Sequence, residues 1–315
     1  MSSQRLRKLV QSGALQLPLP GCGATRSRWA ALAAFAREDV VLGRLVEAHT
    51  DAAAILLELG AGSVEAGQLW GVWAAEAPTP VVSAHRVGTR WQLRGTKLWC
   101  SGAHSCTHAL VTARTGEQRA LFAVELSQSG VAPVPDSWPA VGMAASDSGA
   151  VVFDEAAAVL VGTPGAYLSR PGFWHGAIGV AASWYGGACG VADALVDRAA
   201  RGGVDEHALA HLGHVASALS GARWALDAAA AEVDADPYDD ARMAQSRAHR
   251  VRAVVEAAAT DTMQHVGRAL GAGPLCTDAA HAHRVADLTV YLRQSHAERD
   301  LATLGGHVVE HGAPW

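Results

Sequence analysis

The feature that most constrains the fold is a strand-rich segment enclosed by helical sequence. From about residue 68 to residue 162, short apolar or alternating runs are separated by turn clusters such as APTP, RTGEQ and PVPDSWP. Short strands at such regular spacing predict an all-β sandwich or barrel. Before and after this segment, apolar residues recur at three- and four-residue spacing, which predicts helices. The chain is therefore expected to be a multidomain α+β protein.

Three segments are predicted. They are an N-terminal helical region (1–67), a central antiparallel β-sandwich or barrel (68–162) and a C-terminal four-helix bundle (163–315). Four long apolar patterns carry the bundle, namely 172–203, 207–233, 236–273 and 277–310. Gly186, Gly187 and Gly190 lie inside the first pattern, where small residues allow helices to pack closely. A chain of 315 residues is long enough for two or three such domains.

Composition excludes several classes of protein. With 25 basic and 30 acidic residues, the chain has no basic stripe of the kind that binds nucleic acid. No apolar run reaches the roughly 18–20 residues of a membrane helix, and the start lacks the apolar segment of a signal peptide. A cytoplasmic protein without a membrane partner is expected. The motifs of Rossmann, P-loop, zinc-protease and serine-hydrolase sites are absent from the sequence.

Cysteine and histidine give no metal site. The five cysteines are odd in number and scattered, without a CxxC pair, so neither a disulfide framework nor a zinc site is predicted. His207, His211 and His214 are spaced so that they could share a helix face. Because no carboxylate ligand stands at matching spacing, we expect surface or interface histidines and no metal.

Two stretches of the central segment carry the informative pattern. Residues 88–114 read GTRWQLRGTKLWCSGAHSCTHALVTAR, and VGMAASDSGAVVFDEAAAV begins at Val141. Together they resemble the two β-domain motifs of the acyl-CoA dehydrogenase family, whose helix–strand–helix order is also the order predicted here. The chain resembles a divergent, shortened member of that family. The matching positions of the first motif are Trp91, Leu93, Gly95, Lys97, Trp99, Ser101, Gly102, Ala113 and Arg114.

The resemblance implies FAD as cofactor. In the family, the indole at Trp99 covers the isoalloxazine ring, and the hydroxyl at Ser101 hydrogen-bonds near the reactive nitrogen of the flavin, with Gly102 in the same loop. An indole stacks well on a flat tricycle, and a hydroxyl can donate or accept as the ring is reduced. The stretch MQHVGRALGAG loosely matches the family's dinucleotide motif. Its residues expected to face the cofactor are Gln264, Gly267 and Gly271.

The main function implied is the FAD-dependent oxidation of a CH–CH bond in a small-molecule substrate, an acyl thioester such as acyl-CoA or a related compound. Relatives form dimers or tetramers through the C-terminal bundle, so a homodimer or homotetramer is expected. The sequence also departs from the family. Only about 67 residues precede the strands, and in WAAEAPTPVV the threonine of the usual strand-loop motif is replaced by Ala75 while its glycine, serine and aspartate are missing.

The catalytic base is the most consequential departure. Dehydrogenation needs a carboxylate against the Cα–Cβ bond of the substrate. The family's glutamate position falls near Ser295 in YLRQSHAERD, and Glu298, one turn away, could substitute only in a different register. The same tail is similar to flavin-dependent monooxygenases of this fold, such as the dibenzothiophene monooxygenase type, which need no such base. His296 is then a candidate acid or hydrogen bonder, with an ordinary helix-surface histidine as the alternative.

A third hypothesis also remains open. The missing base, the altered strand loop and the short N-terminal region fit a non-catalytic subunit, which would work within a hetero-oligomer.

Overall fold

The computed structural model describes residues 2–312, which divide into two compact units. The β unit comprises the residues up to Leu17, Arg44–Ala140 and Ala144–Phe173. The helical unit comprises Pro18–Gly43, Val141–Met143 and the residues from Trp174 onward. Each unit is described by itself. The predicted division at residues 67 and 162 stays a prediction.

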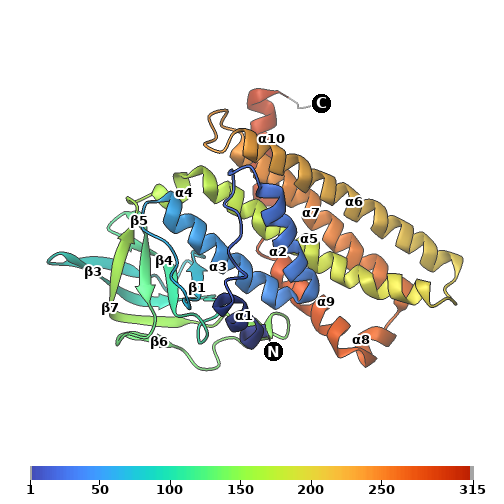
Figure 1. Cartoon of the computed structure of the whole chain (residues 1–315), viewed down its shortest axis with the longest axis horizontal. Coiled ribbons are helices and arrows are strands. Elements are labelled where there is room, and N and C mark those ends of the chain that lie inside the picture. The colour runs from blue at the N-terminus through green and yellow to red at the C-terminus, as the bar shows by residue number, and fades with distance from the viewer. Residues whose placement is uncertain (1, 313–315) are drawn as a thin grey trace. The chain divides into compact units, whose positions relative to one another are not determined.

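The helices and strands are labelled in Figure 1. The helices are α1 (Ser2–Gln11), α2 (Thr25–Glu38), α3 (Val40–Glu58), α4 (Ala166–Ser169), α5 (Pro171–Ala200), α6 (Glu206–Ala235), α7 (Ala244–Leu270), α8 (Gly273–Thr277), α9 (Ala279–Leu292) and α10 (Glu298–His311), with a 3₁₀ turn, η1, at Ala144–Ser146. The strands are β1 (Trp70–Trp73), β2 (Ser83–Val87), β3 (Arg90–Lys97), β4 (His108–Thr115), β5 (Gln118–Glu125), β6 (Val131–Pro133) and β7 (Val151–Val161). N-terminal helices, strands and C-terminal helices thus follow in the predicted order.

The strands close into a mixed barrel. Antiparallel pairings join β2 to β3, β3 to β7, β7 to β5 and β5 to β4. The ring closes where Ser83 of β2 lies beside Arg114 of β4 in a parallel pairing, and β1 is also parallel to β4. A closed ring leaves few exposed sheet edges. The predicted barrel is confirmed. Most of its pairings are antiparallel, and those of β1 and β2 with β4 are parallel, because β1 and β2 follow one another along the same edge of β4.

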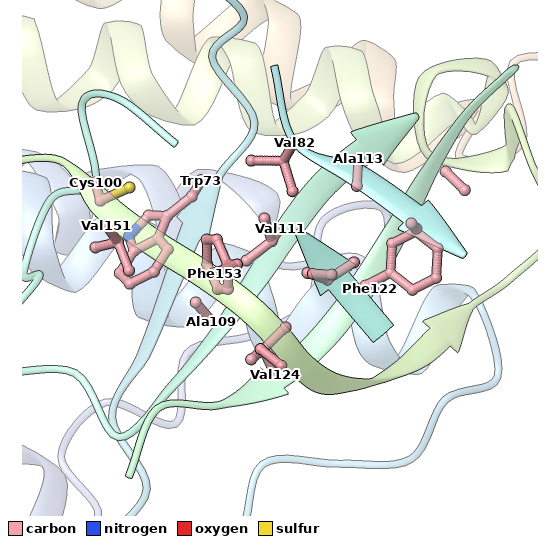
Figure 2. Close-up of a cluster of buried hydrophobic side chains, with 14 of the residues drawn as sticks. Trp73, Val82, Cys100, Ala109, Val111, Ala113, Phe122, Val124, Val151 and Phe153 are labelled. Carbon is pink, nitrogen blue, oxygen red and sulfur yellow. The ribbon is translucent and has the colours of Figure 1, made fainter. Parts of the chain in front are cut away.

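The barrel is filled by the alternate side chains of its strands (Figure 2). Trp73, Phe122 and Phe153 are its largest members and are each at most 1% exposed. The opposite face of β4 is covered as well, because Leu110 packs in a second cluster with Ile55 of α3. A strand buried on both faces is a rigid base for the loop that precedes it.

Gly95 allows the residues just before β2 to approach β3 closely. The register of β3 shifts between Leu93 and Gly95, and Gly95 has a φ of +124°. A Cβ at this position would lie 2.3 Å from the carbonyl oxygen of Val81. Only glycine meets both conditions.

The helical unit is built on the long helices α5, α6 and α7, which run side by side in Figure 1. Helix α2 packs closely on α5, since a Cβ at Gly186 would lie 2.0 Å from the Ala33 carbonyl oxygen and one at Gly190 would lie 2.8 Å from that of Arg37. The interpretation of these glycines as helix-packing residues is confirmed. No helix among the described residues has the length and apolar character needed to cross a membrane.

The last predicted helix, 277–310, is wrong as a single helix. The chain forms α9 and α10, separated by residues 293–297, with Ala297 at a φ of +43°. Side-chain contacts stabilise this turn. Arg252 donates to the Gln294 carbonyl oxygen at 3.1 Å, and the Ser295 hydroxyl oxygen accepts from the Ala297 N–H at 3.1 Å. These contacts compete with helical hydrogen bonds that the sequence pattern alone would favour.

Candidate functional site

The structure places Trp99, Ser101 and Gly102 together in the short loop between β3 and β4. Trp99 has a left-handed backbone, with φ of +58°, and its side chain is 50% exposed although it is one of the largest apolar groups in the chain. Ser101 is buried beside it. Gly102 has a φ of +76°, and a Cβ there would lie 2.7 Å from the Cys106 sulfur. The loop therefore exposes the Trp99 indole, while Ser101 and Gly102 beside it are closely packed.

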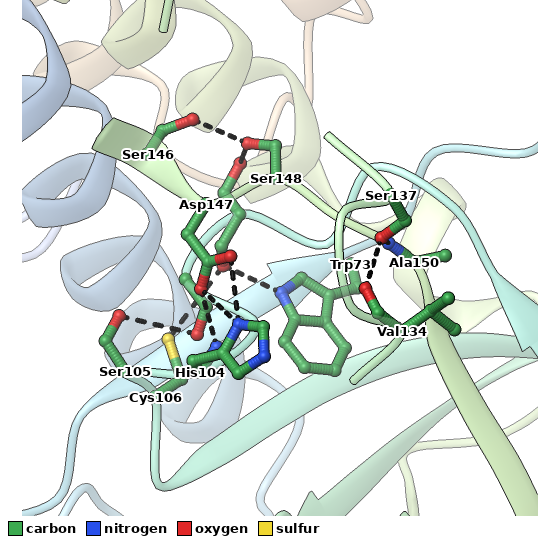
Figure 3. Close-up of polar contacts among 12 residues, drawn as sticks. Trp73, His104, Ser105, Cys106, Val134, Ser137, Ser146, Asp147, Ser148 and Ala150 are labelled. Carbon is green, nitrogen blue, oxygen red and sulfur yellow. Dashed lines mark hydrogen bonds and ion pairs between the residues drawn. The ribbon is translucent and has the colours of Figure 1, made fainter. Parts of the chain in front are cut away.

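A second segment, 146–149, holds this loop in place. The N–H groups of Cys100, Gly102 and Ala103 donate to the carbonyl oxygens of Gly149, Ser146 and Asp147 at 2.8, 2.8 and 3.1 Å. The Asp147 carboxylate accepts from the His104 N–H at 2.7 Å and lies 3.0 Å from its ring Nδ1 (Figure 3). Because backbone and side chain both participate, the loop conformation is strongly determined by residues nearly fifty positions away.

Three serine hydroxyls form a buried chain between the two segments. Ser101 Oγ lies 2.8 Å from Ser148 Oγ. Ser148 Oγ in turn lies 2.8 Å from Ser146 Oγ (Figure 3). The three residues are 5%, 7% and 0% exposed. Sequence reasoning proposed only Ser101. Ser146 and Ser148 are visible in the sequence as an S-x-S pattern inside the second motif. That pattern does not indicate that their hydroxyls contact Ser101.

Two further residues, Trp73 and Lys97, make hydrogen bonds to the loop and between the strands that flank it. The Trp73 indole N–H donates to the Ser101 carbonyl oxygen at 3.0 Å. Lys97, at the end of β3, donates from Nζ to the carbonyl and hydroxyl oxygens of Thr112 at 3.0 and 2.8 Å. Burial lowers the pKa of Lys97 to about 8, with Glu76 acting in the opposite direction. Lys97 thus links the end of β3, which leads into the loop, to β4, which follows the loop.

The helical unit holds the remaining predicted residues, in two separate places. Gln264, Gly267 and Gly271 lie at the C-terminal end of α7, and no described atom lies within 4 Å of a Cβ built at either glycine. His296 and Glu298 lie at the turn between α9 and α10, which Arg252 of α7 contacts. Fifteen residues of helix separate Arg252 from Gly267, about 22 Å along the axis. The structure does not bring these two sets together within this unit.

Ser295, near which the family resemblance predicted the catalytic glutamate, makes a contact that sequence reasoning missed. The Ser295 hydroxyl donates to Glu256 Oε2 of α7 at 2.7 Å. The other carboxylate oxygen, Oε1, accepts from Arg293 Nη2 at 3.1 Å. No motif marked Glu256, because it lies in a helix 39 residues earlier. Both carboxylate oxygens are therefore engaged in holding the turn.

His296 is exposed on the same turn. Its Nδ1 lies 3.5 Å from Asp300 Oδ1, one helical turn later, while Glu298 is exposed in the first turn of α10. Arg252, which holds the turn, places its guanidinium 4.5 Å above the ring of the buried Trp184. The turn that carries His296 is thus fixed by a buried cation–π contact and a charge-assisted hydrogen-bond network.

Comparison with known proteins identifies the fold of the chain. The family model "Acyl-CoA dehydrogenase, middle domain" matches residues 71–156. The solved structure of TdsC from Paenibacillus sp. A11-2 with FMN and indole superposes with a TM-score of 0.83 at 18% identity, covering 99% of this chain and 96% of that one. The chain has the acyl-CoA dehydrogenase fold. No protein of curated function matches its sequence.

Two more structures of the acyl-CoA dehydrogenase fold are similar over the whole chain. Methanesulfinate monooxygenase MsuC from Pseudomonas fluorescens gives a TM-score of 0.81 at 20% identity and covers 98% of this chain and 90% of that one. KijD3 in complex with FMN and a dTDP-linked amino sugar gives 0.81 at 19% identity, covering 98% and 87%. At such identities these similarities establish the fold.

Two other features of this acyl-CoA dehydrogenase-like chain lie on its helical unit. His211 Nδ1 lies 2.8 Å from His265 Nδ1, and the ring of His214 stacks on that of His265 at 3.8 Å. Within residues 2–312, no group of three or more His, Cys, Asp or Glu side chains has the arrangement of a metal site. A groove of about 500 Å³ lies on the helical unit among α2, α5 and α6, and none of the predicted site residues lines it.

Proposed function

We propose that the chain is a flavin-dependent monooxygenase acting on a small-molecule substrate. The observation that carries the proposal is the contact between Ser295 and Glu256. An acyl-CoA dehydrogenase needs a carboxylate free to remove the α-proton. The resemblance predicts that glutamate near Ser295, whose hydroxyl contacts Glu256, and the Glu256 carboxylate is engaged by Ser295 and Arg293. A monooxygenase that uses reduced flavin and oxygen needs no such base.

The residues of the β-unit loop fit a flavin. A half-exposed indole on a fixed, left-handed backbone supplies a flat apolar surface for a tricyclic ring. The buried Ser101 hydroxyl, held by Ser148, supplies a polar group at its edge. Bound flavin would provide the electron-transfer and oxygen chemistry, while these side chains bind and orient it.

FMN is the proposed form of the cofactor, in place of the FAD expected from the sequence resemblance. The TdsC and KijD3 complexes named above contain FMN. In this chain, Arg268 and Leu270 stand where the dinucleotide motif of relatives has glycines. Gln264, Gly267 and Gly271 stay candidate contacts to a dinucleotide, should FAD be the cofactor bound.

His296 is the proposed acid of the reaction. It is exposed, its turn is fixed by Arg252 and Glu256, and its Nδ1 faces Asp300. An imidazole ionises near neutral pH and can therefore supply or accept a proton during oxygen transfer. Glu298 is not assigned a role in the monooxygenase. The homodimer or homotetramer expected from the resemblance, and the hetero-oligomeric alternative, stay predictions.

The test begins with titration of the purified protein by FMN and by FAD, followed by visible absorbance. We expect tight binding of FMN with a perturbed flavin spectrum. Oxygen uptake is then measured with NADH, a flavin reductase and panels of aromatic, sulfur-containing and amino compounds, in parallel with acyl-CoA thioesters and an electron acceptor. Turnover of acyl-CoA, or binding of neither flavin, would overturn the proposal.

A matched pair of histidine variants tests the assigned acid. His296→Ala should lower turnover at least 100-fold while flavin affinity stays within twofold, because general acid catalysis contributes about 10²–10⁴-fold. His207→Ala, a change of another exposed histidine of the same unit, should leave turnover unchanged. Equal effects of the two substitutions would remove His296 from the mechanism.

A further inference from the structure

The buried serine chain has a direction that can reverse. Each hydroxyl carries one hydrogen and two lone pairs, so a row of three hydroxyls has two ordered arrangements. In one, Ser101 donates to Ser148 and Ser148 donates to Ser146. In the other, Ser146 donates to Ser148 and Ser148 donates to Ser101. The two separations of 2.8 Å permit either arrangement without movement of a heavy atom.

The direction of the chain decides what Ser101 can offer to a ligand. When Ser148 donates to Ser101, the hydrogen of Ser101 is free to be donated elsewhere. When Ser101 donates to Ser148, its oxygen is free to accept. The reactive ring nitrogen of a flavin is an acceptor when oxidised and carries a hydrogen when reduced. The two arrangements of the serine chain therefore match the two oxidation states.

We propose that Ser148 is a positioning residue that lets Ser101 donate to oxidised flavin and accept from reduced flavin. This inference rests on the proposed flavin function and adds Ser148 and Ser146 to it. The residues are nine-tenths or more buried, so water is a poor substitute partner for them. A backbone hydrogen bond also fixes Ser146 next to the loop that carries Ser101, because the Gly102 N–H donates to the Ser146 carbonyl oxygen at 2.8 Å.

Removing the Ser146 hydroxyl, at the end of the chain, affects the two oxidation states unequally. With reduced flavin, Ser101 accepts from the ring and donates to Ser148, whose own hydrogen then needs Ser146 as acceptor, so Ser146→Ala leaves a buried donor without a partner. With oxidised flavin, Ser148 donates to Ser101, Ser101 donates to the ring, and only one lone pair of Ser148 loses its partner. An unsatisfied buried donor costs more than one unused lone pair on an oxygen that has two. The variant should bind reduced flavin more weakly than oxidised flavin.

The experiment measures the midpoint potential of FMN bound to the full-length protein, together with the Kd for oxidised FMN. Ser146→Ala should lower the potential by about 30 mV, equivalent to a tenfold loss of affinity for the reduced form in a two-electron couple, while the Kd for oxidised FMN changes less than threefold. Ser146→Thr keeps the hydroxyl and should retain the wild-type potential. The control is Ser137→Ala. Ser137 lies in the same region, but its hydroxyl contacts Val134 and Ala150 and should leave the potential unchanged.

A double-mutant cycle separates this role from a structural one. In a Ser101→Ala background, adding Ser146→Ala should leave the potential unchanged, because the proposed effect of the serine chain reaches the flavin through Ser101. An equal shift in both backgrounds, or no shift in the single variant, would overturn the inference. If Ser146→Ala does not fold, Ser146→Gly, which also lacks the hydroxyl, is used instead, and a potential identical to wild type in that variant has the same consequence. Failure of the flavin function itself would be visible separately, as a wild-type protein that binds no FMN.

Discussion

Ser295 Oγ and Glu256 Oε2 lie 2.7 Å apart, linking the turn between α9 and α10 to the middle of α7. Arg293 contacts the other oxygen of the same carboxylate. A carboxylate that accepts from a hydroxyl and a guanidinium is stabilised in its ionised form and is oriented by both donors. The contact therefore fixes the turn that carries His296, and it leaves both oxygens of the Glu256 carboxylate engaged by donors.

This contact gives the first prediction. Glu256→Ala removes two charge-assisted hydrogen bonds and leaves Ser295 without its acceptor, so we expect it to lower the free energy of unfolding by about 2 kcal/mol. Glu298→Ala, on the exposed first turn of α10, should change it by less than about 0.5 kcal/mol. Urea denaturation of the two variants measures the difference. Equal stabilities would mean that the turn is held without Glu256.

The second prediction concerns Trp99. Its side chain is half exposed and its backbone is left-handed, so Trp99→Gly removes little buried surface and relieves an unfavourable φ. We expect stability within about 1 kcal/mol of wild type but flavin affinity at least tenfold weaker, because the stacking surface is lost. Trp224→Ala, which truncates another exposed indole on α6, should leave flavin affinity unchanged. Thermal unfolding and FMN titration test both expectations, and unaltered affinity in the Trp99 variant would remove the indole from the site.

Gly95 gives a third, purely structural prediction. An added methyl group would meet the Val81 carbonyl oxygen at 2.3 Å and would have to tolerate a φ of +124°. Gly95→Ala should therefore lower the free energy of unfolding by about 3 kcal/mol or more. Gly116→Ala, at a φ of +60° with open space around the new methyl group, should cost only about 1 kcal/mol. Chemical denaturation compares the two, and similar losses would show that β2 moves aside easily.

The helix–strand–helix order could be predicted from sequence because hydrophobic periodicity is a local signal. Gly186 was likewise interpretable, since a glycine inside an apolar helical pattern usually marks close packing against a neighbouring helix. The parallel pairing of β1 with β4 was not predictable, because it depends on how a strand of four residues fits along an edge already shared with β2. Local patterns do not encode that choice.

The candidate site divides in the same way. Trp99 and Ser101 could be proposed from the sequence because they stand in one contiguous motif. Ser148 and Glu256 could not, because their partners lie far away in the sequence. Ser148 contacts Ser101 across 47 residues, and Glu256 contacts Ser295 across 39 residues. The break before α10 was missed for a related reason, because the Arg252 contact to Gln294 that stabilises it comes from another helix.

The last prediction concerns the pH dependence of stability and arises from His49 of α3. This side chain is 6% exposed, and its Nδ1 accepts a hydrogen bond from the Trp70 N–H at 3.3 Å. An acceptor nitrogen must be unprotonated, and burial lowers the pKa of His49 from 6.5 to about 4. Above pH 6.5 the imidazole is neutral in both folded and unfolded chains and contributes no pH dependence.

Below pH 6.5 the unfolded chain takes up a proton at His49 that the folded chain resists until about pH 4. The unfolded state is favoured increasingly over this interval, so stability falls as the pH falls, by at most about 3 kcal/mol from this one group. His49→Gln keeps an acceptor for the Trp70 N–H but cannot be protonated. Its unfolding free energy should therefore decline less steeply between pH 6.5 and pH 4 than that of the wild type. His207→Gln, at an exposed position, should retain the wild-type slope, and identical slopes for all three proteins would show that His49 is not the group that titrates.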